Sequence, residues 1–264
     1  MRDRRGHVNF REGLISAALV IGVALCGLWS WARAVSYFQL PKALLPTPQQ
    51  CLQAASDNAS DLLYGTYSTG VAAVVGLLVA VLIGSCVAIV FSQSRAIRLA
   101  LFPYAILLQT VPIVAVAPLL IIWSGYTFRT VVIVTVIVCL FPIINSVTAG
   151  LLAIDRELSD LFQLYGAGRS KRLLKLQFPS AIKHLILGTK TSAGLAVIGA
   201  IVAEFFVGNG TDYDGLGTLM TGWQALAKTD ALIAALMASA MLGLALFGIV
   251  HLLSITVFAR WTRS

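Results

Sequence analysis

The chain has 264 residues, of which 58% are hydrophobic and only 11% charged, and its mean hydropathy is +0.88. A soluble domain carries about 25% charged residues, so this composition excludes an ordinary water-soluble protein and indicates one embedded in a membrane. The net charge of +8 does not indicate nucleic-acid binding, because no basic soluble domain remains once the apolar segments are set aside.

Apolar segments recur along the chain at lengths that match the hydrocarbon core of a bilayer. That core is about 30 Å thick and takes about 20 helical residues, and a helix satisfies all its backbone hydrogen bonds within one segment. We therefore predict an all-α membrane protein with one transmembrane domain, residues 13–258, between tails 1–12 and 259–264. Its six predicted transmembrane helices are Gly13–Ala32, Gly65–Phe91, Leu99–Trp123, Thr130–Leu152, Leu185–Val207 and Ala231–Phe258.

The first predicted span follows the basic segment MRDRRGHVNFRE, as the hydrophobic part of a signal peptide would. Its length of about 20 residues exceeds the usual length of about 7 to 15, and no good cleavage site of small residues follows it. We expect an uncleaved span.

Positive charge is distributed unequally between the two sides that six spans define. The side that holds both termini carries fourteen Lys and Arg residues, whereas the other side carries four, with Lys190 inside the fifth span left unassigned. Cytoplasmic segments are the richer in Lys and Arg. We therefore expect both termini, and the segment between the fourth and fifth spans, in the cytoplasm.

Two further features concern the outer segment after the first span and the prolines of the third and fourth spans. On the outer side, Thr47 precedes Pro48 as a helix N-cap precedes a proline at the first helical position, so we predict a short amphipathic helix there. Within the third and fourth spans, four prolines each remove a backbone hydrogen bond and can bend the helix; these are Pro103, Pro112, Pro118 and Pro142.

Charge is concentrated in the segment DRELSDLFQLYGAGRSKRLLKLQFPSA, between the fourth and fifth spans. Its first part has one apolar helix face, the apolar stripe, which consists of Leu158, Leu161, Phe162 and Tyr165. Asp155 is the predicted N-cap, and Gly166 is the predicted left-handed C-cap. Ser170 is then expected to cap a second, basic helix that ends at Pro179.

Two readings of this segment remain open on physical grounds. One is a helix lying on anionic lipid, with its lysines and arginines toward the head groups. The other is a docking surface for a cytoplasmic partner protein.

The spacing of this segment resembles that of a known family, the inner-membrane permeases of binding-protein-dependent ABC importers. Their cytoplasmic loop motif is EAA, three residues, Gly, nine residues, Ile, one residue, Leu-Pro. Here Asp160-Leu161-Phe162 is followed after three residues by Gly166 and, after nine more, by Leu176, Gln177 and Phe178-Pro179. Only the glycine and the proline are identical, but the acidic and apolar characters are kept.

The resemblance extends to the nitrate, sulfonate and taurine branch of these permeases. LPTPQQCL is similar to the entry of that branch, LQTVPIVAVAPLLIIWSG to its third span, and AGLAVIGAIVAEFFVG with GLGTLM to its fifth span and outer loop. The resemblance implies a type I ABC importer permease fold, located in the cell inner membrane.

The resemblance also implies a role for the loop at residues 153–184. In the family this loop forms a coupling helix that enters a cleft on a separate ATP-hydrolysing subunit. The residues expected to couple to the ATPase are Asp160, Leu161, Phe162, Tyr165, Gly166, Arg169, Leu176 and Pro179.

Several partners follow from the resemblance and from one missing motif. The sequence has no GxxxxGK[ST] phosphate-binding loop, so ATP hydrolysis is expected in a partner chain rather than here. We expect two ATPase subunits, a second permease subunit in a homodimer, a periplasmic or lipid-anchored binding protein, and membrane lipid. No cofactor, metal site or catalytic cluster is indicated.

Polar residues within the spans are the candidates for the substrate path, because polar groups in a bilayer tend to face a cavity or a partner. Gln109, Thr110 and Asn145 could face the path or form hydrogen bonds between helices. Glu204 could line a gate or meet the binding protein. We favour a structural role for Glu204, either paired with Arg129 or reaching the outer interface.

The substrate is open among nitrate, sulfonates, taurine, pyrimidine precursors of thiamine, and riboflavin. Lys190 is the cation nearest to the interior of a span, and this scarcity of cations favours a neutral or vitamin-like solute. The alternative function is an ion-coupled secondary transporter or channel. The sequence has neither the internal repeat nor the carboxylate relay that would favour it.

Overall fold

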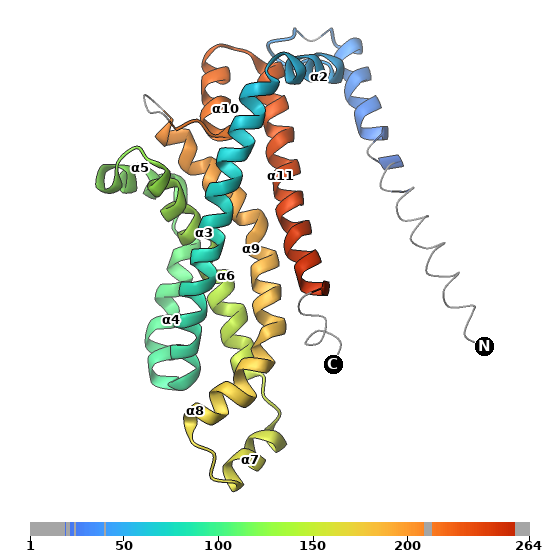
Figure 1. Ribbon diagram of the computed structural model, residues 1–264. Coiled ribbons are helices and arrows are strands. Elements are labelled where there is room, and N and C mark those ends of the chain that lie inside the picture. The colour runs from blue at the N-terminus through green and yellow to red at the C-terminus, as the bar shows by residue number, and fades with distance from the viewer. Residues whose placement is uncertain (1–18, 20–21, 24, 40, 209–212, 257–264) are drawn as a thin grey trace, which may run out of the picture. The chain divides into compact units, whose positions relative to one another are not determined.

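The computed structural model describes residues 19, 22–23, 25–39, 41–208 and 213–256, and this part of the chain is helical apart from short connections. The predicted all-α class is confirmed. The elements in chain order are α2 (Pro48–Asp57), α3 (Ala59–Gln93), α4 (Arg95–Thr110), α5 (Ile113–Ser124), α6 (Phe128–Leu152), α7 (Arg156–Leu164), α8 (Arg169–Arg172), the π-helical turn η1 (Leu173–Gln177), α9 (Phe178–Val207), α10 (Leu216–Ala225) and α11 (Thr229–Thr256), shown in Figure 1.

The chain divides into two units. The smaller comprises Met1–Ala59 with Trp223–Ala234, and the larger comprises Ser60–Gly222 with Ala235–Ser264. In the smaller unit, Thr47 caps α2 as predicted. Its hydroxyl accepts a hydrogen bond from the Gln50 amide at 3.3 Å, and the Gln50 side chain accepts one from the Thr47 amide at 2.9 Å.

Among the described residues, four single helices are long and apolar enough to cross a bilayer: α3, α6, α11 and the continuous helix Arg169–Val207. They correspond to the second, fourth, sixth and fifth predicted spans. Residues 13–18, 20–21 and 24 of the first predicted span, Gly13–Ala32, lie outside the described residues, and residues 25–37 are helical.

The third predicted span, Leu99–Trp123, is not one continuous helix. It is divided into α4 and α5, which are bent by 96° with respect to each other (Figure 1). The break falls at Val111 and Pro112, because proline offers no backbone N–H and disfavours a helical residue before it. Counted as one, the bent pair would bring the number of candidate spans in the described part of the chain to five.

The larger unit is built around α6 packed against α9. Small residues allow a close approach, since a Cβ on Gly199 would lie 3.1 Å from the Cα of Thr135. The two backbones are also linked by side chains: the Cys139 thiol donates to the Ser192 carbonyl at 3.5 Å, and the Ser192 hydroxyl donates to the Cys139 carbonyl at 3.4 Å.

The basic segment after Gly166 differs from the prediction. Ser170 does not cap a helix, because α8 already begins at Arg169 with Gly168 in the N-cap position. Pro179 does not end the helix either, since α8, η1 and α9 form one continuous helix. The wider π turn just before Pro179 can accommodate the missing N–H and the proline ring, which a regular α-helical turn could not.

Candidate functional site

The helix α7 and its C-terminal turn carry most of the residues expected to couple to an ATPase. Asp155 occupies the N-cap position as predicted, although its side chain makes no capping hydrogen bond. Asp160, Leu161 and Phe162 lie on the helix, and Tyr165 is its C-cap. Within the larger unit, α7 lies at the end of α9 opposite to α10 (Figure 1).

A Schellman motif ends α7. Gly166 has the left-handed φ of +62° that was predicted for it. The Ala167 amide donates to the Phe162 carbonyl at 2.9 Å, and the Gly166 amide donates to the Gln163 carbonyl at 3.0 Å. These two bonds hold the last turn of α7 in a fixed shape.

The apolar stripe of α7 is open rather than packed against the chain. Leu158 and Leu161 are each 46% exposed and Tyr165 is 83% exposed, while Phe162 is half-buried. Asp160 is exposed beside them. A short helix with an open apolar face and charged neighbours offers a contact surface for another molecule.

The remaining residues of the predicted set lie on the long continuous helix Arg169–Val207. Arg169 is the exposed first residue of α8, Leu176 is half-buried in η1, and Pro179 lies in the first turn of α9. A hydrogen bond of 2.8 Å from the Arg172 guanidinium to the Ser159 hydroxyl ties this helix to α7.

The other polar site is the Glu204 cluster, which consists of Glu204, Thr69, Tyr213, Leu216 and Gly217 near the C-terminal end of α9. Glu204 is fully buried. Its carboxylate accepts hydrogen bonds from the Thr69 hydroxyl and the Tyr213 hydroxyl at 2.9 Å and from the Gly217 amide at 2.8 Å. The Thr69 hydroxyl accepts another from the Leu216 amide at 2.8 Å.

This cluster caps the N-terminus of α10. Leu216 and Gly217 are the first residues of that helix, so their amides have no partner within it. The positive end of the α10 dipole also faces the carboxylate, which explains how a buried negative charge is accommodated. Burial and the charge of Glu204 raise the pKa of the Tyr213 phenol, so this hydroxyl stays protonated and can donate.

The contacts of Glu204 are made with other partners than expected. It forms no ion pair with Arg129 in the part of the chain that the structure describes, and its side chain is buried rather than exposed. Sequence reasoning missed Thr69 and Tyr213, because single hydroxyl residues in apolar surroundings give no distinctive signal. The paired glycines of GLG, Gly215 and Gly217, were a usable signal: a Cβ on either would collide with Glu204.

The remaining candidates for the substrate path do not come together. Gln109 and Thr110 are exposed at the C-terminal end of α4, just before the bend. Asn145 is exposed on α6 and lines a pocket between α4 and α6, which Gln109 and Thr110 do not line.

Lys190 has a partner that the sequence did not indicate. Its ammonium lies 2.9 Å from Nδ1 of His251 on α11, and the His251 ring is stacked on Phe247 at a centroid distance of 6.3 Å. Lys190 is half-buried, so a cation does stand within the predicted fifth span.

Comparisons with known proteins agree with the resemblance in the sequence. Residues 76–264 match the family described as the inner membrane component of binding-protein-dependent transport systems. A probable ABC transporter permease protein of Haemophilus influenzae is 30% identical over 89% of this chain and 93% of its own length.

Two further relatives carry substrate names. The formylaminopyrimidine transport permease protein ThiX of Halalkalibacterium halodurans is 31% identical over 66% of this chain and 68% of its own. The riboflavin transport system permease protein RibX of Chloroflexus aurantiacus is 33% identical over 64% of this chain and 62% of its own. The chain thus belongs to the family of inner membrane components of binding-protein-dependent transport systems, the permeases of ABC importers.

Proposed function

We propose that this chain forms the transmembrane path of an ABC importer and that α7 docks on a separate ATPase subunit. The observation that carries the proposal is the open apolar stripe of α7, which ends in the Schellman turn at Gly166. The stripe lies at the position of the family's cytoplasmic loop motif. Leu161, Phe162 and Tyr165 would enter an apolar cleft, with Asp160 and Arg169 at its rim.

The connection from α7 to the membrane suits the transfer of movement. The Arg172–Ser159 hydrogen bond couples α7 to α8, and α8 continues without a break through η1 into α9. A displacement of α7 by the ATPase would therefore be passed along one helix. Its outer end carries Glu204, so ATP-driven movement would reach α10 through the Glu204 cluster.

The assembly that we propose contains two copies of this chain, each with six spans and both termini in the cytoplasm, in the inner membrane. Two ATPases and a solute-binding protein complete it. The topology rests on the unequal distribution of Lys and Arg. The membrane-facing or subunit-facing surface would include Leu99 on α4 and Met241 and Leu244 on α11, all strongly exposed.

The solute that we propose is a small vitamin-like ring compound. ThiX and RibX, whose names specify formylaminopyrimidine and riboflavin, are among the most similar relatives. Calorimetric titration of the associated binding protein with riboflavin, a formylaminopyrimidine, taurine and nitrate tests this. Tighter binding of taurine or nitrate than of either ring compound would contradict it.

The docking role is tested with two leucines of α7, one inside the apolar stripe and one beside it. Leu161 lies in the apolar stripe, whereas Leu164 is 85% exposed outside it. Leu161→Ser should lower co-purification of the ATPase about tenfold, because it removes an apolar anchor, and Leu164→Ser is the matched control. Asp160→Lys should uncouple ATP hydrolysis from uptake in reconstituted vesicles.

Two results would overturn the proposal. Equal loss of the ATPase from both serine variants would mean that the stripe is not the contact. Uptake driven by an ion gradient, in vesicles that contain this chain and no ATPase, would instead support a secondary transporter.

A further inference from the structure

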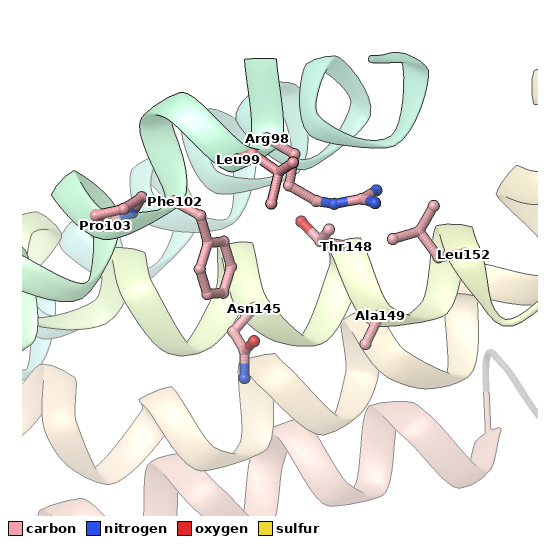
Figure 2. Close-up of a pocket in the computed structure, with 8 residues that line it drawn as sticks. All are labelled: Arg98, Leu99, Phe102, Pro103, Asn145, Thr148, Ala149 and Leu152. Carbon is pink, nitrogen blue, oxygen red and sulfur yellow. The ribbon is translucent and has the colours of Figure 1, made fainter. Parts of the chain in front are cut away.

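A pocket of about 400 Å³ lies between α4 and α6, separate from α7 and from the Glu204 cluster. Its walls are mainly apolar, with Leu99, Phe102 and Pro103 on α4 and Leu152 on α6 (Figure 2). The ring of Phe102 is flanked by Phe91 at 6.3 Å and Phe141 at 6.2 Å between centroids, which makes that wall rigid.

A buried hydroxyl in this pocket lacks a partner. Thr148 is only 5% exposed, and its Oγ1 makes no hydrogen bond to any residue that the structure describes. Other helical threonines bond back to the carbonyl four residues earlier: Thr66 to Leu62, Thr135 to Val131 and Thr189 to Leu185. Figure 2 shows the Thr148 hydroxyl turned toward α4 instead. Because an unsatisfied buried hydroxyl is costly, it points to a ligand.

The guanidinium of Arg98 lies above Thr148 and extends toward Leu152 (Figure 2). Among the described residues it makes one long hydrogen bond, 3.4 Å to the Phe91 carbonyl, although guanidinium has five N–H donors. No ion pair with an acid is formed by Arg98 within the described residues. The amide of Asn145 is directed away from Arg98, so it does not complete this pair. Arg98 and Thr148 together offer donors to an anionic oxygen group.

We propose that this pocket binds the phosphate group of an anionic inner-leaflet phospholipid, held by Arg98 and Thr148, with an acyl chain along Leu99 and Phe102. The proposal rests on the topology proposed above, which places this end of the spans in the cytoplasm. Arg98 is the fourth residue of α4, and Thr148 lies in the last turns of α6. Both therefore lie at the depth of lipid head groups.

A phospholipid fits this pocket better than a transported solute does. The charged group sits at one end of an apolar surface, as in an amphipathic ligand, rather than within a polar cavity midway along the spans. Leu99 is also 66% exposed, so the surface continues outward from the pocket, as an acyl chain would require. The cytoplasmic leaflet is rich in anionic lipid, which Arg residues at this depth attract.

The test measures lipid retention by the full chain in detergent. Phosphatidylglycerol and phosphatidylcholine with the same acyl chains are added, and native mass spectrometry counts the bound lipids. We expect a preference for phosphatidylglycerol. Arg98→Gln should weaken its retention about tenfold, because charge-assisted hydrogen bonds to phosphate are strong. Thr148→Val should weaken it about threefold without lowering the thermal midpoint, since it removes an unpaired hydroxyl at nearly constant volume.

Arg95→Gln is the matched control, since Arg95 is exposed one turn away on α4 and does not line the pocket. It should change retention by less than about twofold. If Arg98→Gln does not fold, Arg98→Lys serves instead. Lysine keeps the positive charge but lacks the planar guanidinium with its paired donors, so we expect an intermediate loss of phosphatidylglycerol retention.

Three results would overturn the proposal: equal retention of the two lipids, equal loss in the Arg98 and Arg95 variants, or full competition by glycerol 3-phosphate, which would make the pocket a solute site. The measurement uses the chain without an ATPase, so its failure is independent of the coupling proposal.

Discussion

The two ends of the long helix that includes α9 differ in how the groups around them are satisfied. At its C-terminal end, the buried carboxylate of Glu204 accepts hydrogen bonds from two side chains and a backbone amide. Beside its N-terminal end, α7 holds apolar side chains such as Leu161 and Tyr165 open. The polar groups around Glu204 are paired within this chain, whereas we propose that the open side chains of α7 are covered by another chain.

This difference separates residues that stabilise the fold of this chain from residues that are available for contacts with a partner. A saturated buried network stabilises its own chain, and every lost partner leaves a costly unsatisfied group. An open apolar stripe contributes little to the stability of its own chain and gains its value on association. Changes around Glu204 should therefore reduce stability, and changes on α7 should reduce partner binding while stability is kept.

The largest effect is expected for Glu204→Ala. It leaves the Thr69 hydroxyl and the Gly217 amide without their acceptor in a buried site, so we expect a loss of about 3 kcal/mol in folding free energy. Unfolding of the purified chain by SDS in mixed micelles measures it. Asp214→Ala is the matched control, since Asp214 is an exposed acid next to Tyr213. Equal free energies of unfolding for the two variants would mean that the Glu204 cluster does not stabilise the fold.

A second prediction compares two glycines of α10. A Cβ on Gly217 would lie 2.5 Å from the Ile201 carbonyl oxygen, whereas a Cβ on Gly222 would meet nothing within 4 Å. Gly217→Ala should lower the free energy of unfolding by about 1 to 3 kcal/mol through overpacking. Gly222→Ala should raise it by about 0.5 to 1 kcal/mol, because alanine favours a helix. The same unfolding titration measures both, and a stabilising Gly217→Ala would contradict the close packing of α10 on α9.

Local patterns gave the parts of this fold that depend on neighbours in sequence. The capping box at Thr47 and the left-handed turn at Gly166 were both predictable, because each depends on residues within one turn. Helical periodicity likewise identified the apolar stripe of α7. For this reason the candidate docking surface was largely accessible from the sequence.

Features that depend on tertiary contacts or on alternative backbone geometries could not be predicted from the sequence. Four prolines in the third and fourth spans look alike in sequence, but only Pro112 coincides with the 96° bend. The expected stop at Pro179 failed because a π turn accommodates that proline. Thr69 lies 135 positions from Glu204, so no local pattern could join them.

A third, smaller effect is expected at the turn after α7. Gly166 has a φ of +62°, at which a Cβ costs about 1 kcal/mol, so Gly166→Ala should loosen the last turn of α7. Hydrogen exchange of the Gly166 and Ala167 amides should become about fivefold faster. Gly168→Ala is the control, because Gly168 has a φ of −61° and open surroundings. Equal exchange in both variants would mean that the Schellman motif does not hold this turn.

The smallest effect on stability is expected for Leu161→Ser in the isolated chain. Leu161 is 46% exposed, so the change should alter the free energy of unfolding by no more than about 0.5 kcal/mol. Leu151→Ser, in the last turn of α6, is the contrast: Leu151 is 1% exposed, and its loss should cost about 3 kcal/mol through a cavity and a buried hydroxyl. SDS titration of the two variants compares them directly. A large loss for Leu161→Ser would show that the stripe packs within its own chain, so that reduced ATPase binding would then report misfolding rather than a lost contact.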